Sequence, residues 1–294
     1  MMPDVTDRPS VAQLVAGATQ VLAQAGVSSP GHDARALAAY ALGVEKLYGL
    51  LDRRVDDAAL AAFAAAVERR RHREPLQHIV GSTGFRYLTL AVEPGVFVPR
   101  PETEVVAQVA IDEADALCRA GAAPIVVDLC CGAGGIAISV ATEVPGSLVT
   151  AVDLSAAAVA LTRRNAHAAG VGALRLEQGD VREPELLADL DEAVDIVVSN
   201  PPYIPSDAVP IEPEVRDHDP DLALYGGGED GLEIPRAVLA AAHRLLRPGG
   251  LLVMEHAEVQ QAAAQTAATH AGFTDVHTVE DLSGRPRAVV GRRG

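Results

Sequence analysis

The stretch "NPPY" at residues 200–203 places an amide side chain directly before two prolines and a phenol. Proline has no backbone N–H and a fixed φ, and it disfavours the helical region for the residue before it. The stretch is therefore predicted to be rigid, extended and rich in carbonyl acceptors. It follows the apolar run "VDIVV", so we expect it where a buried strand ends. Such a loop is either a plain strand terminator or a socket for an –NH₂ group.

A planar amino group suits this socket. The nitrogen of an amide or an aromatic amine is a poor nucleophile because its lone pair is delocalised. If the side-chain oxygen of Asn200 and the carbonyl of Pro201 accept its two hydrogens, the nitrogen is oriented and gains electron density. Tyr203 can cover the planar group, and Pro202 belongs to the same substrate-binding stretch. Asn200, Pro201 and Tyr203 are therefore candidate catalytic residues for methylation of an amino group.

A second set of residues is typical of a nucleoside site. "VVDLCCGAGG" places Asp128 at a predicted strand end and Gly132 and Gly134 in the turn before a helix. Asp153 ends the next strand, where it can accept both hydroxyls of a ribose, and Asp180 ends a third, within reach of an adenine amino group. The pattern fits a dinucleotide fingerprint and S-adenosylmethionine equally well, and a purely structural turn is a third interpretation. "NPPY" favours S-adenosylmethionine, because hydride transfer needs no acceptors facing an amine.

Short apolar runs separated by helical stretches carry these residues. We expect strands within residues 123–130, 147–153, 174–180, 194–200 and 250–256, and a closing pair within 273–281 and 285–292. Such alternation predicts an α/β fold with a mostly parallel sheet and helices on both faces. In such folds ligands bind beyond the carboxyl ends of the strands, where the candidate residues lie.

The first part of the chain is predicted to be helical. Apolar residues recur at helical spacing from residue 14 to Gly26, and residues 32–43 and 56–73 resemble further helices. The expected domains are residues 1–75, a linker at 76–100 with a β-hairpin that turns at Glu93-Pro94-Gly95, and residues 101–294. The arginines at 69–71 and 73 are either a partner-binding patch or, as we prefer, a solvated helix end.

The net charge of −16 is unevenly distributed. Residues 1–95 balance ten basic against ten acidic residues, whereas sixteen acids lie between Asp180 and Glu233 beside only Arg182 and Arg216. That segment contains "NPPY". We therefore expect that the docking partner is not a polyanion, and no direct binding of nucleic acid is predicted.

Composition indicates a soluble cytoplasmic protein. The three cysteines, Cys118, Cys130 and Cys131, suit a reducing compartment, and they lack other Cys or His at ligand spacing, so no metal site is expected. Cys130 and Cys131 are expected to act as small buried hydrophobes. No apolar run is long enough to span a bilayer, and residues 1–10 lack the pattern of a signal peptide.

Five motifs occur in order: "VFVPRPETE", "DLCCGAGG", "NPPYIP", "DPDLALYGGGEDGL" and "MEH". Together they resemble the HemK/PrmC family, the release-factor glutamine methyltransferases, over nearly the whole chain. The resemblance implies a Rossmann-like class I methyltransferase domain with a seven-stranded, mostly parallel sheet after a helical substrate-binding domain. It implies S-adenosylmethionine as donor, release factors as partners and the glutamine of their GGQ motif as acceptor, in support of translation termination. It assigns cofactor contacts to Asp128, Cys130, Gly132, Gly134, Asp153, Asp180 and Asn200, and amide positioning to Asn200, Pro201 and Tyr203.

Several assignments stay open at this stage. The family often has glycine where this chain has Cys130. Arg100 is either an ion-pairing residue or part of the substrate channel, and Glu102 either binds substrate or, with Thr103, begins a helix. Glu255 and His256 end a strand near the site, and structural roles are preferred for them. The rival functions are methylation of amino groups in nucleic acid and a non-catalytic S-adenosylmethionine-binding module.

Overall fold

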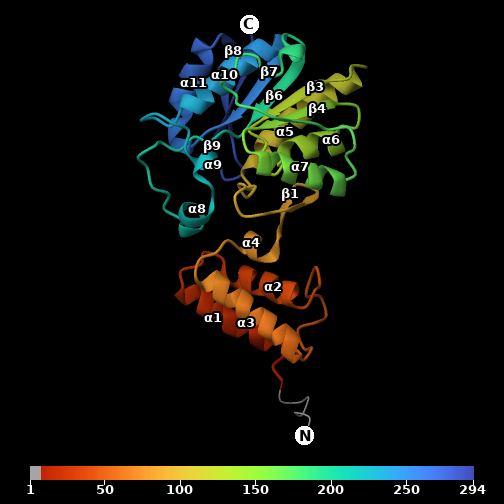
Figure 1. The fold of residues 1–294 in the computed structure, drawn as a ribbon, viewed down its shortest axis with the longest axis vertical. Helices are drawn as coiled ribbons and strands as arrows, with labels where there is room; N and C mark the ends of the chain where they lie inside the picture. Colours follow the sequence, from red (N-terminus) through yellow and green to blue (C-terminus); the bar gives the residue numbers. More distant parts are fainter. Residues whose placement is uncertain (1–7) are drawn as a thin grey trace. The chain divides into compact units, whose positions relative to one another are not determined.

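A computed structural model describes residues 8–294, and Figure 1 shows their helices and strands. Residues 1–7, which hold most of the stretch without a signal-peptide pattern, lie outside the described residues. The chain divides into two compact units. One comprises Met1–Ser82 and Pro210–His218, and the other comprises Thr83–Val209 and Asp219–Gly294. The segment 210–218, which the sequence assigned to the larger domain, thus belongs to the first unit.

The first unit is helical, as the apolar spacing predicts. Its helices are α1 (Val11–Gln24), α2 (Pro30–Ala41), α3 (Asp57–Arg71), α4 (Leu76–Val80) and α8 (Pro213–His218). Ser10 and Gln13 form a capping box at the start of α1, and Gly26 follows its end with a φ of 74°. Leu22, Leu37 and Phe63 are buried together in its core.

The arginine run at the end of α3 is only partly a solvated helix end: Arg69 and Arg71 are exposed, as predicted, but the prediction was wrong for Arg70 and Arg73. Arg70 is only 5% exposed, and its guanidinium lies 2.7 Å from Asp33 Oδ2 and 2.8 Å from Glu214 Oε1. Arg73 donates to both oxygens of Glu214, at 2.7 and 2.6 Å. Burial raises the pKa of Glu214, but the hydrogen bonds from Arg73 and Arg70 prevail and hold it at about 2. The sequence could not show this cluster because Glu214 is distant along the chain.

The β-hairpin turns earlier than predicted. Its strands are β1 (Ser82–Phe85) and β2 (Leu88–Ala91), so the turn is at Arg86–Tyr87 and not at Glu93-Pro94-Gly95. Phe85 and Leu90 are each 1% exposed in the core of the second unit. Burial of these two side chains sets the register, and it outweighs the local turn preference of Pro-Gly.

The second unit is built on a seven-stranded sheet, which confirms the predicted fold class. The strand order is β5-β4-β3-β6-β7-β9-β8, and β9 alone runs opposite to the other six strands. The strands are β3 (Ile125–Leu129), β4 (Leu148–Asp153), β5 (Arg175–Gln178), β6 (Val194–Ser199), β7 (Leu246–Glu255), β8 (Phe273–Glu280) and β9 (Pro286–Arg293). Every strand expected from the apolar runs is therefore present.

Helices cover both faces of this sheet (Figure 1). On one face lie α5 (Thr103–Arg119), α6 (Gly135–Glu143) and α7 (Ala156–Ala168), and on the other lie α10 (Glu233–Leu245) and α11 (Gln261–His270). The remaining short elements are α9 (Asp221–Leu224) and the 3₁₀ turns Ala188–Leu190 and Glu258–Gln260. Alternate strand residues feed two separate cores, with Val126 in one and Val127 in the other, since successive side chains of a strand point to opposite faces. Among residues 8–294, no helix is both long and apolar enough to cross a membrane.

Candidate functional site

The parallel register brings the candidate residues to one edge of the sheet. Leu129, at the end of β3, pairs with Val152 of β4 on one side and with Ser199 of β6 on the other. Asp153 pairs with Gln178 at the end of β5. The glycine turn, Asp153, Asp180 and "NPPY" therefore follow neighbouring strand ends, where α/β folds bind ligands.

The two glycines of the turn have different roles. A Cβ atom at Gly134 would lie 2.6 Å from Cγ2 of Thr162, so this glycine is required for packing against α7. A Cβ atom at Gly132 would meet nothing within 4 Å, so open space lies beside this residue. Its φ is 56°, which favours glycine, and its N–H donates to Oδ2 of Asp153 at 2.8 Å. Gly132 thus fits the predicted cofactor contact, and Gly134 positions the turn.

Cys130 occupies a glycine-like conformation. Its φ is 64°, in the left-handed region, which favours glycine over residues with a Cβ atom. Burial raises the pKa of its thiol well above the usual range, and the carboxylates of Asp153 and Asp128 raise it further. The thiol is therefore neutral, which argues against a nucleophilic role, and Cys131 beside it is buried.

Asp153 and Asp180 lie where ribose and adenine contacts were predicted, but both carboxylates already have partners. Asp153 accepts the N–H groups of Gly132 and Ser155, each at 2.8 Å, while burial raises its pKa. Each carboxylate oxygen can accept more than one hydrogen bond, so hydroxyl groups can still be bound. Asp180 lies two residues beyond β5 and pairs with Arg182 at 2.6 Å, and this hydrogen bond lowers its pKa. An adenine amino group would share Asp180 with Arg182.

Asp128 is not at the strand end but within β3, and it is fully buried. Its Oδ2 accepts the N–H of Ala137 at 3.1 Å, and burial raises its pKa to about 8. Oδ1 has no hydrogen-bond partner among the residues that the structure describes. A buried acceptor without a donor fits a site that a donor-bearing ligand completes.

The "NPPY" loop is held from several sides. The N–H of Ile204 donates to Leu224 O at 2.8 Å, and the N–H of Gly226 donates to Ile204 O at 2.9 Å. Nε2 of Gln260 donates to Tyr203 O at 2.8 Å. A Cβ atom at Gly226 would lie 2.0 Å from Gly231 O and 2.5 Å from Pro202 O, so only glycine allows this close approach. The glycine-rich segment that follows "NPPY" therefore supports the loop, a role that the sequence analysis missed.

The side chains of Asn200 and Tyr203 both have buried partners. Nδ2 of Asn200 donates to Oγ1 of Thr103 at 3.1 Å. The hydroxyl of Tyr203 donates to Oε1 of Glu255 at 3.2 Å, and burial raises the pKa of this phenol above its usual range. Glu255 is 2% exposed, and burial raises its pKa to about 7. Thr103 and Glu255 are thus next to the candidate site. In the sequence, the only signal for this was that their motifs, "PRPETE" and "MEH", occur in one chain with "NPPY".

Arg100 has the contacts of the ion-pairing alternative. Its guanidinium forms an ion pair with the buried carboxylate of Asp219 and lies 4.9 Å from the ring centroid of Phe97. Glu102 is the exposed N-cap residue of α5 and makes no side-chain capping hydrogen bond. His256 is buried, with Nδ1 2.8 Å from Ala257 O, and burial lowers its pKa. Among the described residues, none of these three side chains hydrogen-bonds to Asn200 or Tyr203, although the positive charge of Arg100 lowers the pKa of Tyr203.

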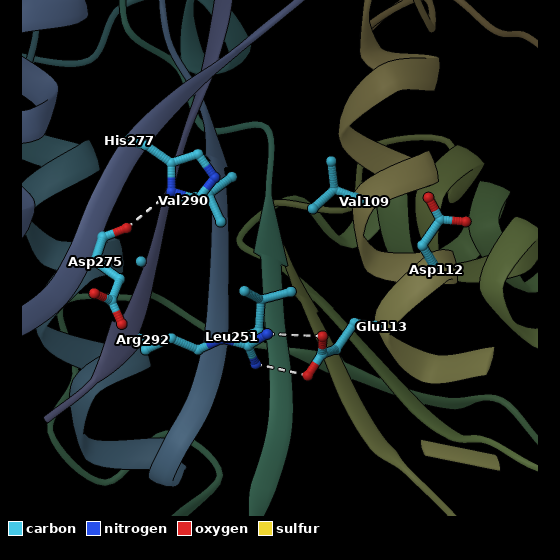
Figure 2. Close-up of a pocket in the computed structure, with 9 residues that line it drawn as sticks. Val109, Asp112, Glu113, Leu251, Asp275, His277, Val290 and Arg292 are labelled. Carbon is cyan, nitrogen blue, oxygen red and sulfur yellow. Dashed lines mark hydrogen bonds and ion pairs between the residues drawn. The ribbon is translucent and has the colours of Figure 1, made fainter. Parts of the chain in front are cut away.

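A surface cavity of about 390 Å³ lies elsewhere in the second unit, between α5 and strands β7, β9 and β8 (Figure 2). Arg292 spans it to pair with Glu113 at 2.6 Å, and Nδ1 of His277 lies 2.8 Å from Asp275 O. No candidate site residue lines this cavity; its lining consists of Val109, Asp112, Glu113, Leu251, Asp275, His277, Val290, Gly291 and Arg292. Within residues 8–294 no cluster of His, Cys, Asp or Glu could hold a metal ion.

Comparison with known proteins connects both units to one family. Residues 13–81 match the model of the PrmC N-terminal domain, and residues 88–211 match that of the methyltransferase small domain. The chain is 50% identical to the "Release factor glutamine methyltransferase" of Streptomyces coelicolor, over 95% of this chain and 96% of that protein. The corresponding protein of Bifidobacterium longum is 45% identical, over 94% and 97%.

Two further proteins are informative. The "4-amino-L-phenylalanine/4-methylamino-L-phenylalanine methyltransferase" of Streptomyces pristinaespiralis is 44% identical, over 87% of this chain and 86% of that protein. Among solved structures, the 16S rRNA N2 G1207 methyltransferase of T. Thermophilus, in complex with AdoMet and guanosine, has a TM-score of 0.52 at 20% identity. That match covers 72% of this chain and 50% of the other. The latter likeness concerns the fold of the sheet and its helices.

Proposed function

Because the chain belongs to the family of release factor glutamine methyltransferases, we propose that it transfers a methyl group from S-adenosylmethionine to a glutamine of peptide chain release factors. The acceptor atom is the side-chain amide nitrogen of the glutamine in the GGQ motif. The observation that carries this proposal is the rigid "NPPY" loop at the carboxyl edge of the sheet, next to the glycine turn. It supplies two fixed acceptors where a methyl donor binds in this fold.

The residues of the turn fit the cofactor. S-adenosylmethionine supplies an electrophilic methyl group when it is bound. Gly132 offers open space beside its backbone, Asp153 can accept hydroxyl groups, and Asp128 has a buried oxygen without a donor. We assign these residues, together with Cys130, Gly134, Asp180 and Asn200, to the cofactor site.

Asn200, Pro201 and Tyr203 act on the acceptor. The side-chain oxygen of Asn200 and the carbonyl of Pro201 accept the two hydrogens of the amide, which orients the nitrogen and increases its electron density. Tyr203 covers the planar group, and Pro202 stiffens the stretch. After methylation the nitrogen is cationic and loses one proton readily. No basic side chain is needed, in agreement with the raised pKa of Tyr203, which keeps the phenol protonated.

The related enzyme of S. pristinaespiralis, by its name, uses an aromatic amine, and such an amine is also a planar –NH₂ with a delocalised lone pair. The same socket can therefore serve two classes of acceptor. We favour the glutamine because the similarity to release factor enzymes is as high and covers more of the chain. The helical first unit, which matches the PrmC N-terminal domain, would hold the body of a release factor in the cytoplasm.

Nucleic acid is the other acceptor class with planar amino groups. The excess of acidic residues around "NPPY" would repel a polyanion, but many of these acids are neutralised by arginine in the structure. Nine of the sixteen acids between Asp180 and Glu233 form ion pairs with arginine. The repulsion is therefore weaker than the sequence count implies, and a direct test of nucleic acid is required.

Transfer of labelled methyl from S-adenosylmethionine tests the proposal. Four acceptors are compared: a purified release factor, the same factor with its GGQ glutamine changed, 4-amino-L-phenylalanine, and a mixture of DNA and RNA. We expect label on the intact factor alone. Label on nucleic acid or on the amino acid, or equal label on the two factors, would contradict the proposal.

A further inference from the structure

We propose that Thr103 and Glu255 are positioning residues, which orient Asn200 and Tyr203 through one connected set of polar contacts. This inference rests on the proposed function, since it concerns how the socket presents its acceptor to a substrate –NH₂. It also explains why three separated motifs occur in one chain: Thr103 comes from "PRPETE", Asn200 and Tyr203 from "NPPY", and Glu255 from "MEH".

The first step concerns the orientation of Asn200. The two ends of an amide have nearly the same size, so only its hydrogen bonds decide which way it points. Nδ2 of Asn200 donates to Oγ1 of Thr103 at 3.1 Å. Oδ1 therefore lies on the other side of the amide, where it can accept from a substrate. In the flipped state Nδ2 would face the substrate hydrogens, and two donors would repel each other.

The second step concerns Thr103, because a hydroxyl can both donate and accept. On its own it would tolerate either orientation of Asn200. Thr103 is 5% exposed, and its hydroxyl lies near enough to the carboxylate of Glu255 to lower the pKa of that acid, while Oε2 of Glu255 has no hydrogen-bond partner among the described residues. A carboxylate is only an acceptor, so the threonine proton points to Glu255. The lone pairs of Oγ1 are then left for Nδ2 of Asn200.

The third step connects Tyr203 to the same carboxylate. Its hydroxyl donates to Oε1 of Glu255 at 3.2 Å, which holds the hydroxyl end of the side chain in place. Glu255 is 2% exposed and ends β7. The residue before it, Met254, pairs with Ser199 of β6, which is the residue before Asn200. One buried carboxylate thus determines the orientation of both substrate-facing side chains. These orientations require that Glu255 is ionised, so that its carboxylate only accepts hydrogens.

The ionisation of Glu255 makes the arrangement sensitive to pH. Burial raises its pKa to about 7, although the hydroxyl groups of Thr103 and Tyr203 and the charge of Arg287 on β9 lower it. Glu102 at the start of α5 raises it. Below this pKa Glu255 carries a proton that it can donate to Thr103, and the direction of the hydrogen bonds is no longer specified. Methyl transfer should therefore decline as the pH falls below about 7.

Three variants test the inference in the full-length protein: Thr103→Val, Thr103→Ser and Glu255→Gln. Thr103→Val keeps the shape but removes the hydroxyl, and we expect kcat to fall at least about tenfold, as for a lost preorganised group. The Kd of S-adenosylmethionine and the KM of the release factor should stay within about twofold. Thr103→Ser restores the hydroxyl and should recover most of kcat. Glu255→Gln should lower kcat and abolish the decline near pH 7.

Thr150→Val is the matched control, because Thr150 is also 5% exposed but lies within β4. It should leave kcat unchanged. Equal kcat for Thr103→Val and the wild type, or no recovery in Thr103→Ser, would overturn the inference, and so would an unchanged pH decline in Glu255→Gln. If Thr103→Val does not fold, the pH profile of Glu255→Gln decides. Labelling of the release factor by the wild type is a separate outcome, so failure of the proposed function is recognised independently.

Discussion

At the scale of single residues, the structure separates groups that face open space from groups that support them. Gly132 and Gly134 lie in the same glycine turn, but only Gly134 is needed for packing, since a Cβ atom there would overlap Thr162. Asn200 and Thr103 differ in the same way. In the proposed socket Asn200 offers its amide oxygen to substrate, whereas the buried Thr103 accepts a hydrogen bond from its Nδ2. Conformation and burial thus assign roles that residue type does not.

Asp153→Asn should weaken the binding of S-adenosylmethionine about tenfold to a hundredfold. A hydrogen bond to a charged acceptor contributes about 1.5–3 kcal/mol, and the amide replaces one acceptor oxygen by a donor. Isothermal titration calorimetry measures the Kd. Asp189→Asn, which changes an acid paired with Arg175 away from the turn, is the control and should leave the Kd unchanged. An unaltered Kd for Asp153→Asn would remove this residue from the cofactor site.

Asn200→Ala should separate binding from chemistry. Loss of one preorganised polar group typically lowers kcat about a hundredfold or more, whereas the glycine turn, which we propose to contact the cofactor, is untouched. We expect the Kd of S-adenosylmethionine to change by no more than a few-fold. Single-turnover transfer of labelled methyl to the release factor gives the rate. If the variant turned over near the wild-type rate, the assignment of "NPPY" as the amide socket would be wrong.

At the scale of elements, the loop after β6 depends on backbone contacts that leave no room for a side chain. A Cβ atom at Gly226 would lie 2.0 Å from Gly231 O and 2.8 Å from Cα of Tyr203. Because both neighbours are backbone, they cannot move aside without displacing "NPPY". The shape of the socket is therefore determined by a segment more than twenty residues further along the chain.

Gly226→Ala should consequently reduce both stability and activity. Overpacking of a close backbone contact costs about 1–3 kcal/mol, and the displaced loop should lower kcat more than the loss of stability explains. Denaturant unfolding and methyl transfer are measured on the same preparation. Gly172→Ala is the control, because a Cβ atom at Gly172 meets nothing within 4 Å. A Gly226→Ala protein with wild-type kcat would show that the contact does not shape the socket.

The elements were largely predictable from periodicity, whereas their supporting contacts were not. Apolar runs located all the strands of the sheet, most clearly the central parallel strands β3 and β6, which are buried on both faces. The hairpin turn was misplaced because burial of Phe85 and Leu90 outweighed the turn preference at Pro94-Gly95. Thr103, Gly226 and Glu255 lie in motifs that the sequence analysis quoted, but only the fold shows that they contact "NPPY".

At the scale of the whole molecule, one excursion of the chain links the two units covalently. The chain leaves the second unit after Val209, contributes α8 to the first unit, and returns at Asp219. Glu214 fixes α8 within the first unit through Arg70 and Arg73, and Asp219 forms an ion pair with Arg100 in the second. The excursion begins a few residues after "NPPY", so the loop of the site is continuous with a segment held by the helical unit.

Glu214→Gln should destabilise the first unit and release α8. Removal of one partner from a buried ion pair costs about 3 kcal/mol or more, and the 17% exposure of the Glu214 side chain reduces this to about 2–3 kcal/mol. Two arginines, one of them buried, would be left without this partner. The folded-state pKa of about 2 lies below the ordinary 4.5, so the wild-type pair stabilises above about pH 4.5, and this contribution is lost as the pH falls toward 2.

Native-state hydrogen exchange of the full chain measures this effect, since it reports local opening of α3 and α8 separately from the sheet. We expect faster exchange in both helices of Glu214→Gln and unchanged protection in β3 and β4. Asp217→Asn is the control on the same helix, because Asp217 forms only an exposed pair with Arg216, and its exchange should match the wild type. Wild-type protection of α8 in Glu214→Gln would mean that packing, and not the buried ion pairs, attaches the excursion to the first unit.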